Sequence, residues 1–181
     1  NEPVCLVRSL LPAQGRAELS IWLGQGEAGT ERENPRGTYS VGENPLIDVR
    51  LPERASWGHL HVAAVDVTGT VFHMLPNTYV PGTRLADLGR VEDGVRRVRV
   101  AHSMAERAED PSVIAFQVNE NFGKTLIIAF HTEEPLFDEL RPISESAEAF
   151  AEALEARIAG RPLDGDRKST RLNSSHVCSS R

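Results

Sequence analysis

One stretch of the sequence, Gly58–Gly82, limits what this chain can fold into more than any other. It reads GHLHVAAVDVTGTVFHMLPNTYVPG, in which two apolar runs, Leu60–Val67 and Thr70–Leu75, flank a short link that contains Gly69. A glycine-bearing link of this kind is typical of a β-hairpin, and Pro76 ends the second run because proline cannot donate a ladder hydrogen bond. The first run is apolar on both faces, as in strands that lie inside layered structures. The sequence therefore predicts a hairpin at the centre of a β-rich domain.

Further strands are predicted on both sides of the hairpin, since apolar residues alternate with polar ones or form short runs there. The segments are Pro3–Arg8, Ala17–Leu23, Leu46–Leu51, Val95–Val100, Val113–Val118 and Lys124–Phe130. In the third of these, alternation places Ile47 and Val49 inward and Asp48 outward. The glycine-rich, charged segment Gly24–Gly37 is expected to be a mobile surface loop.

Two helices are predicted, one between the strands and one after the last of them. A short one at Met104–Glu109 follows Ser103, which is spaced for a capping box. The longer one is the C-terminal helix, with Ser144 expected as its N-cap. Its apolar stripe consists of Ala147, Phe150, Ala151, Leu154 and Ile158.

The pattern as a whole predicts a mainly β fold, an antiparallel β-sandwich that is immunoglobulin-like or a partly closed barrel, with a short C-terminal amphipathic helix. Residues 1–38 would supply N-terminal strands and the mobile loop, 39–142 the sandwich core, 143–160 the helix and 161–181 a disordered tail.

The tail differs in character from the rest of the chain. Asp166–His176 reads DRKSTRLNSSH and resembles the translation of a common DNA-sequencing adapter. The tail also holds one of only two lysines, Lys168, in a chain otherwise dominated by arginine. We therefore expect residues 166–181 to be a non-native artefact, although a natural polar tail is the alternative. Because the chain opens at Asn1 rather than methionine, we also expect it to be a piece of a longer protein.

Charge and apolar content restrict the partners. Residues 1–165 hold 16 basic and 25 acidic side chains, a net charge of −9, which argues against nucleic acid as a partner. No apolar run reaches the roughly 20 residues of a membrane-spanning helix, so we expect no direct membrane insertion. Cys5 is the single cysteine outside the tail, so it predicts neither a disulfide nor a compartment.

The histidines are the candidate metal ligands. His59 and His61 share a face of one strand and His73 lies on the paired strand. No cysteine pair or nearby acidic residue completes a ligand set, and a solvated strand face readily carries histidine. We therefore predict no metal and no cofactor. Gly123-Lys124-Thr125 resembles the end of a phosphate-binding loop, but Val118 stands where that loop needs glycine.

A hydrolase is the other enzymatic possibility. The sequence has no Gly-x-Ser-x-Gly motif, and Ser103 next to His102 has a simpler role as a helix cap. We therefore predict that the chain is not an enzyme, with a small hydrolase or metal-binding protein as the alternative.

The order of several short motifs resembles a bacterial family, domain of unknown function 4384. The motifs are Tyr39-Ser40-Val41-Gly42-Glu43, Gly58-His59-Leu60, Asp66-Val67-Thr68-Gly69, Met74-Leu75-Pro76-Asn77, Gly123–Phe130 and Pro135-Leu136. The resemblance covers residues 39–137, with the C-terminal helix as an addition. His59 departs from the aromatic residue usual at its position, and Val67-Thr68 separates Asp66 from its glycine.

The resemblance implies a non-catalytic accessory domain that mediates interaction or sensing. In that family the domain accompanies kinase-like or caspase-like domains or belongs to cell-envelope proteins. A protein partner or a neighbouring domain is then expected, with a periplasmic or envelope-associated location and a cytoplasmic one as the alternative. Aromatic and arginine side chains commonly anchor interfaces, so the interaction candidates are Tyr79, Asn77, Arg97 and Arg99.

Overall fold

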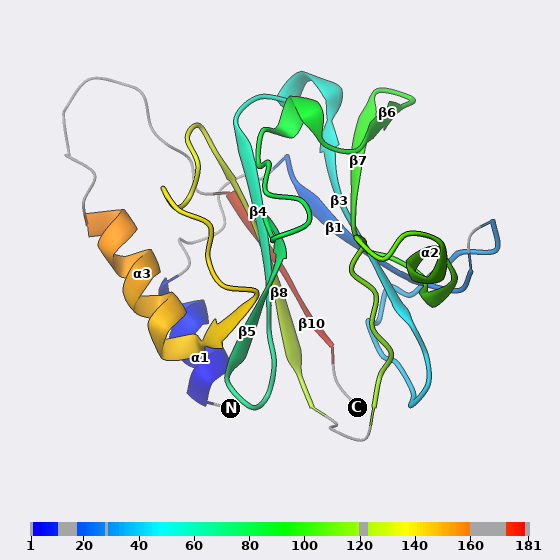
Figure 1. Cartoon of the computed structure of the whole chain (residues 1–181), viewed down its shortest axis with the longest axis horizontal. Coiled ribbons are helices and arrows are strands. Elements are labelled where there is room, and N and C mark those ends of the chain that lie inside the picture. Colours follow the sequence, from blue (N-terminus) through cyan, green and yellow to red (C-terminus); the bar gives the residue numbers. More distant parts are fainter. Residues whose placement is uncertain (1, 11–17, 28, 120–122, 160–172, 180–181) are drawn as a thin grey trace.

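The structure is a computed structural model that describes residues 2–10, 18–27, 29–119, 123–159 and 173–179. Its strands form two antiparallel sheets stacked face to face (Figure 1). Sheet A has the order β2-β1-β3-β7-β6, with bounds Arg32–Glu33, Ser20–Gln25, Pro45–Pro52, Val95–Ala101 and Arg90–Glu92. Sheet B has the order β10-β8-β4-β5-β9, with bounds Asn173–Ser179, Thr125–Thr132, His59–Val65, Thr70–Leu75 and Ser144–Ser146. The predicted antiparallel sandwich is confirmed, and the sheets do not close into a barrel.

The main core lies between the two sheets. Sheet A contributes alternate residues such as Ile47, Val49 and Val98, and sheet B contributes Leu60 and Val62, all of them buried. Alternation along each strand places one set of side chains in this layer, as the sequence predicts for Leu46–Leu51. This packing fixes the inner face of both sheets.

A second core lies on the outer face of sheet B. There α1 (Glu2–Leu10) and α3 (Ala147–Ala159) lie side by side and cover the sheet (Figure 1). Phe150 and Leu154 of α3 are fully buried against β4 and β8 residues such as Val65 and Phe130. The central strands of sheet B are therefore apolar on both faces because each face meets a different core.

The central hairpin is confirmed. β4 pairs with β5 from Val65↔Val71 to Val62↔Leu75, with a register shift after Val62. Asp66 organises the link between the strands, since its carboxylate accepts hydrogen bonds from the backbone of Thr68 (2.8 Å) and Thr70 (2.9 Å). Gly69 has a φ of +86°, a conformation that favours glycine.

The strand predicted at Pro3–Arg8 is wrong, because α1 is formed there. Val4, Val7 and Leu10 recur every three residues, which places them on one side of a helix. Val7 is fully buried in the second core. A short apolar run of this kind fits either a strand or a helix, and here the tertiary contact with α3 favours the helix.

Other boundaries also differ from the predictions. Residues 113–118 form no strand; this segment is held by single hydrogen bonds such as His102 N to Ile114 O (2.8 Å) and Val118 N to Glu43 O (2.9 Å). Part of the loop predicted at Gly24–Gly37 forms β2, which pairs with the end of β1. The predicted strands at Val95–Val100 and Lys124–Phe130 are confirmed as β7 and β8, and the short helix at Met104–Glu109 as α2, with its capping box.

The predicted start of the C-terminal helix is shifted by two residues. Ser144 lies in β9, an edge strand that pairs with β5, and Ser146 Oγ accepts the hydrogen bond of Ala149 N at 3.1 Å. The stripe of α3 is buried as predicted from Ala147 to Leu154, whereas Ile158 is 42 % exposed.

One segment of the tail that is predicted to be disordered forms a strand. Asn173–Ser179, expected to be disordered, forms β10 and pairs with β8 from Asn173↔His131 to Ser179↔Thr125. The rest of the predicted tail lies outside the described residues.

Candidate functional site

A cavity of about 450 Å³ lies at the edge of the sandwich, where the end of β5 and its following loop meet β7. We call it the edge cleft. Its apolar walls come from both sheets and from the segment after α2: Met74, Leu75, Val80, Leu88, Val98, Val100, Val113 and Ile114. Its polar lining consists of Glu31, Asp48, Asn77, Arg90, Arg97, Arg99, His102, Glu106 and Ser112. Three of the four predicted interaction residues, Asn77, Arg97 and Arg99, thus line one cavity.

The loop at 76–82 forms one rim of the edge cleft, and Asn77 holds its shape. The Asn77 side chain is buried, donates to Met74 O (2.7 Å) and accepts from Tyr79 N (2.8 Å) and Val80 N (3.0 Å). The backbone N–H of Asn77 also donates to Val80 O at 3.0 Å. Asparagine suits this position because its side chain can replace backbone partners in a turn. Asn77 is therefore the residue that organises the loop rather than a contact surface.

Tyr79 is the side chain that this loop presents to solvent. It is 55 % exposed, the largest exposed fraction among the large hydrophobic residues that the structure describes, and Val80 beside it is 37 % exposed. Both follow directly from the turn that Asn77 closes. The turn thus displays an exposed aromatic side chain directly beside Val80, which lines the edge cleft.

Arg97 and Arg99 project from the outer face of β7 onto Asp48 of β3. Asp48 is 1 % exposed; one of its oxygens accepts from Arg97 Nη2 at 2.7 Å, and the other accepts from Arg99 Nε. Arg99 also donates to both carboxylate oxygens of Glu31, at 2.8 and 3.0 Å. We call Asp48, Arg97, Arg99 and Glu31 the arginine cluster. Its guanidinium groups are already paired with carboxylates.

Charge pairing sets the ionisation of the arginine cluster. Burial alone would raise the pKa of Asp48, but the hydrogen bonds from Arg99 and Arg97 outweigh it and hold that pKa below its usual range. Burial lowers the pKa of Arg99, and the hydrogen bonds to Glu31 and Asp48 outweigh this effect and raise it. Asp48, Arg97 and Arg99 are therefore ionised at neutral pH.

Trp22 lies on the same outer face of sheet A and stacks with two arginines. The guanidinium carbon of Arg50 is 4.7 Å from the ring centroid, and that of Arg99 is 5.9 Å away. The ring occupies the space above Gly24, where a Cβ would lie 2.1 Å from it. Glycine at position 24 is therefore required for this stacking.

The histidines form a separate polar cluster beneath α3. His61 and His73 are both buried, and His61 Nε2 lies 3.1 Å from His73 Nδ1. His73 Nε2 lies 2.7 Å from Glu145 Oε1 of β9. Glu145 in turn accepts hydrogen bonds from Arg141 Nε (2.9 Å) and Nη2. We call His61, His73, Glu145 and Arg141 the histidine cluster.

Both histidines of this cluster are neutral at neutral pH. Burial lowers the pKa of His61 to about 3, aided by His73 and Arg141. Burial also lowers the pKa of His73, and Glu145 does not fully offset this. A carboxylate only accepts, so His73 Nε2–H donates to Glu145, and His73 Nδ1 then accepts from His61 Nε2–H. The pKa of Glu145 is raised by burial and lowered more strongly by the hydrogen bonds from Arg141 and His73.

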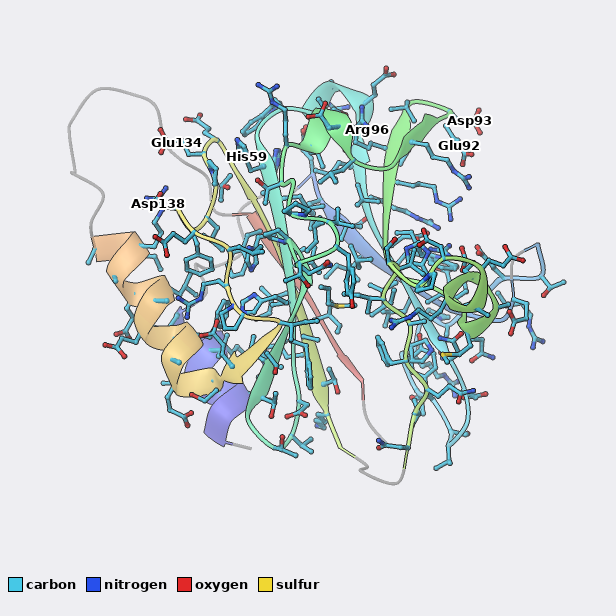
Figure 2. The ribbon with its side chains drawn as sticks, in the orientation of Figure 1. His59, Glu92, Asp93, Arg96, Glu134 and Asp138 are labelled. Carbon is cyan, nitrogen blue, oxygen red and sulfur yellow. The ribbon has the colours of Figure 1, made fainter. Side chains whose placement is uncertain are left out.

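The predicted metal candidates do not converge. His59 is bound through Nδ1 to Thr83 Oγ1 at 2.8 Å, at the end of β4 near Glu134 (Figure 2). His61 and His73 point at each other rather than at a common centre. In the described ranges no group of three or more histidine, cysteine, aspartate or glutamate side chains is arranged to hold a metal ion.

Several members of these clusters escape sequence reasoning. Glu31 lies in the segment interpreted as a mobile loop, and Glu145 lies in the segment interpreted as the first turn of a helix. Arg141 lies in no repeating pattern of the sequence that would indicate a role in a site. Only the alternation of Arg97 and Arg99 opposite Asp48 gave a usable signal, because cross-strand pairing of opposite charges is common.

Two residues that the sequence suggests for hydrolase or phosphate-binding chemistry, Ser103 and Lys124, are not placed for it. Ser103 Oγ accepts from Glu106 N at 3.2 Å, and Glu106 accepts from Ser103 N at 2.7 Å, which is the capping box of α2. Lys124 is exposed directly before β8 rather than at the start of a helix, so it is not placed as in a phosphate-binding loop.

Comparison with protein-family models, with curated proteins and with solved structures gave no match. None of the helices in the described part of the chain is long and apolar enough to span a bilayer.

Proposed function

We propose that this chain is a non-catalytic interaction domain that binds a protein partner or a neighbouring domain through the edge cleft and the Tyr79 loop. The observation that carries this proposal is the loop itself. Asn77 fixes the backbone so that Tyr79 stands exposed on the loop directly beside Val80, which lines a cavity with apolar walls.

The physical chemistry of the loop favours recognition of another polypeptide. Interface energy is concentrated in a few residues, and tyrosine and arginine are enriched among them. A loop that is already ordered loses little conformational entropy when a partner binds. The cleft adds apolar wall for a partner side chain and the paired charges of the arginine cluster as polar contacts. Together these features suit a partner that inserts an apolar side chain and covers Tyr79.

The setting of the domain is a proposal that rests on the family resemblance. A larger bacterial protein with a kinase-like or caspase-like domain, or an envelope protein, would supply the neighbour, and a periplasmic or envelope-associated location would follow. The alternative, a small hydrolase or metal-binding protein, has no comparable observation in its favour, since the buried histidines are bonded to each other and to Glu145.

Peptide-display selection on the immobilised full chain tests the proposal. Peptides selected for binding should lose at least about tenfold in affinity for Tyr79→Ala, a typical effect of removing an interface anchor. Asn77→Ala should also weaken binding, because the loop loses its fixed shape. Ile158→Ala is the matched control, since Ile158 is exposed on α3, on the outer side of sheet B. Peptides that bind Tyr79→Ala as tightly as the wild type would refute this site.

A further inference from the structure

β8 lies next to the edge of sheet B, but its two faces are both buried, as is typical of a strand in the interior of a sheet. Leu126, Ile128 and Phe130 are buried in the core under α1 and α3, and Ile127 and Ala129 are buried between the sheets. Its eight residues include no proline and no acidic or basic side chain other than His131. One side of β8 pairs with β4 in unbroken register from His59↔Thr132 to Val65↔Leu126.

The other side of β8 accepts a strand of seven residues. Asn173–Ser179 pairs with Thr125–His131 in unbroken antiparallel register. β10 also contacts β1 of sheet A, so the occupant of this position closes the edge of the sandwich (Figure 1). Without it, β8 would expose a row of unpaired backbone N–H and C=O groups.

The remaining edges of the sheets are short, as is usual in soluble β proteins. β2 has two residues, and β6 and β9 have three each. β8 has eight residues and lacks the charges, proline and bulges that normally protect an edge. Its construction is therefore that of a strand meant to be covered on both sides.

The segment that covers it is chemically unlike the rest of the sheet. Its sequence, NSSHVCS, contains three serines and one asparagine in seven residues, whereas the five β8 residues from Leu126 to Phe130 are all apolar. It also belongs to the part of the chain that resembles a translated sequencing adapter. The backbone register fits, but the sequence of this segment is far more polar than that of the strand with which it pairs.

We propose that the edge of β8 opposite β4 is a strand-acceptor site whose natural occupant is an extended, apolar segment of a partner protein, and that Asn173–Ser179 occupies it as a substitute. Backbone pairing with Thr125–His131 would supply affinity, and alternate side chains on the two faces would supply specificity. A single strand fits better than the β8 edge of a second copy. The occupant of this position also contacts β1, which leaves little room for the sheet that a second copy would bring with it. This site is separate from the edge cleft, so Tyr79→Ala should leave it unchanged.

Opening the edge in the full chain tests the proposal. The variant Ser175→Pro/His176→Pro changes two consecutive residues, so one of them must carry an N–H that points to β8. The matched control, Ser169→Pro/Thr170→Pro, places the same change in the tail before the strand. Two synthetic heptapeptides serve as probes: the β10 sequence with alanine for Cys178, and the same peptide with valine at the positions of Ser174 and Ser175.

In the first variant we expect hydrogen exchange to accelerate at least tenfold at the alternate amides of Thr125–His131 that point towards β10, while the alternate amides that point towards β4 stay protected. Either peptide should restore the protection, and the valine peptide should bind at least tenfold more tightly than the serine one. The control variant should bind neither. Unchanged β8 protection without peptide, no peptide binding, or a dimer that the valine peptide does not dissociate would each overturn the proposal, the last in favour of a second copy.

A second measurement applies if the double-proline variant does not fold. Excess valine peptide added to the unaltered chain should deprotect the amides of Asn173–Ser179 and leave those of β8 protected, because one strand replaces another. If β10 stays protected at saturating peptide, partner exchange at this edge is excluded.

Discussion

The outer faces of the two sheets each carry a cluster around one largely buried carboxylate, Asp48 or Glu145, and the partners of that carboxylate differ between the two clusters. On sheet A, Asp48 is neutralised by two arginines and the cluster stays in contact with water. On sheet B, Glu145 is shared between Arg141 and the neutral pair His73 and His61, beneath the layer formed by α1 and α3.

The difference follows from what covers each face. Arginine keeps its charge and is found where some hydration remains, as on the partly exposed face of sheet A. Under the helices, desolvation is stronger, so the two histidines stay neutral and form hydrogen bonds instead of ion pairs. A protein of this construction should lose stability in mild acid mainly through the face under the helices, and through the open face at lower pH, where Asp48 is protonated.

Truncating the aromatic core of each face should give the largest contrast. Phe150 is fully buried and packs edge-on against His73 (5.5 Å) and Phe137 (6.1 Å), so Phe150→Ala should cost about 3–5 kcal/mol of unfolding free energy. Trp22 is half-buried on sheet A, and Trp22→Ala should cost about 1–2 kcal/mol despite its larger side chain. Urea unfolding measures both, and equal losses would show that the helical layer contributes no more than the open face.

Acid should act mainly on the covered face. Between pH 6.5 and about 3 the unfolded chain binds a proton at His61 that the folded chain does not, so the unfolding free energy falls as pH falls. At about 1.4 kcal/mol per pH unit, His61 alone should remove about 3 kcal/mol between pH 7 and pH 4.5. His73, whose pKa is also lowered, adds to this loss, and the lowered pKa values of Glu145 and Asp48 add more below their ordinary range.

His61→Gln should flatten that pH dependence, because the glutamine amide can still donate to His73 but does not titrate. The matched control is His59→Gln, since His59 lies two residues away on the same strand but is only partly buried. Chemical denaturation at a series of pH values gives the slopes. If the slope of His61→Gln equals that of the wild type, His61 is not the source of the acid sensitivity.

Removing one carboxylate charge at a time should separate the clusters further. Asp48→Asn leaves Arg97 and Arg99 facing each other without their shared anion, so we expect a loss of about 2–3 kcal/mol. Glu145→Gln removes the counter-ion of Arg141 alone, which is partly exposed, and should cost about 1–2 kcal/mol. Thermal unfolding at pH 7 compares the two, and the opposite order would mean that the histidine cluster holds more charge than its geometry indicates.

The smallest expected effect is that of salt. The Arg99–Glu31 pair is partly exposed, so Glu31→Gln should cost about 0.5–1 kcal/mol at low ionic strength and less in 1 M NaCl. The Phe150→Ala loss should not shrink in the same way. Denaturation at two salt concentrations checks this, and a salt-independent Glu31→Gln effect would indicate a structural rather than an electrostatic role.

Sequence reasoning located the sandwich because strand patterns are local: β3 and β7 alternate, while β8 and the central hairpin contain short apolar runs. It failed where tertiary contact decides the outcome: Pro3–Arg8 became helical against α3, and Ser144 joined an edge strand. The prediction that Asp48 lies on the outward face is correct. The sequence does not show that its carboxylate is buried, because that burial depends on the long side chains of Arg97 and Arg99 reaching across from the neighbouring strand. The predicted interaction residues gather around one cleft, while the link between His73 and Glu145 spans 72 residues and leaves no local pattern.

The contact between α1 and α3 also has a consequence for biosynthesis. Leu10 and Ala147 are about 140 residues apart in the chain, yet their helices share one layer over sheet B. On a ribosome the first helix emerges long before the last, so α1 must wait in an unfinished chain with Val7 exposed. We therefore expect nascent chains that stop short of α3 to engage chaperones, and release of α3 from the exit tunnel to be the event that completes the helical layer over sheet B.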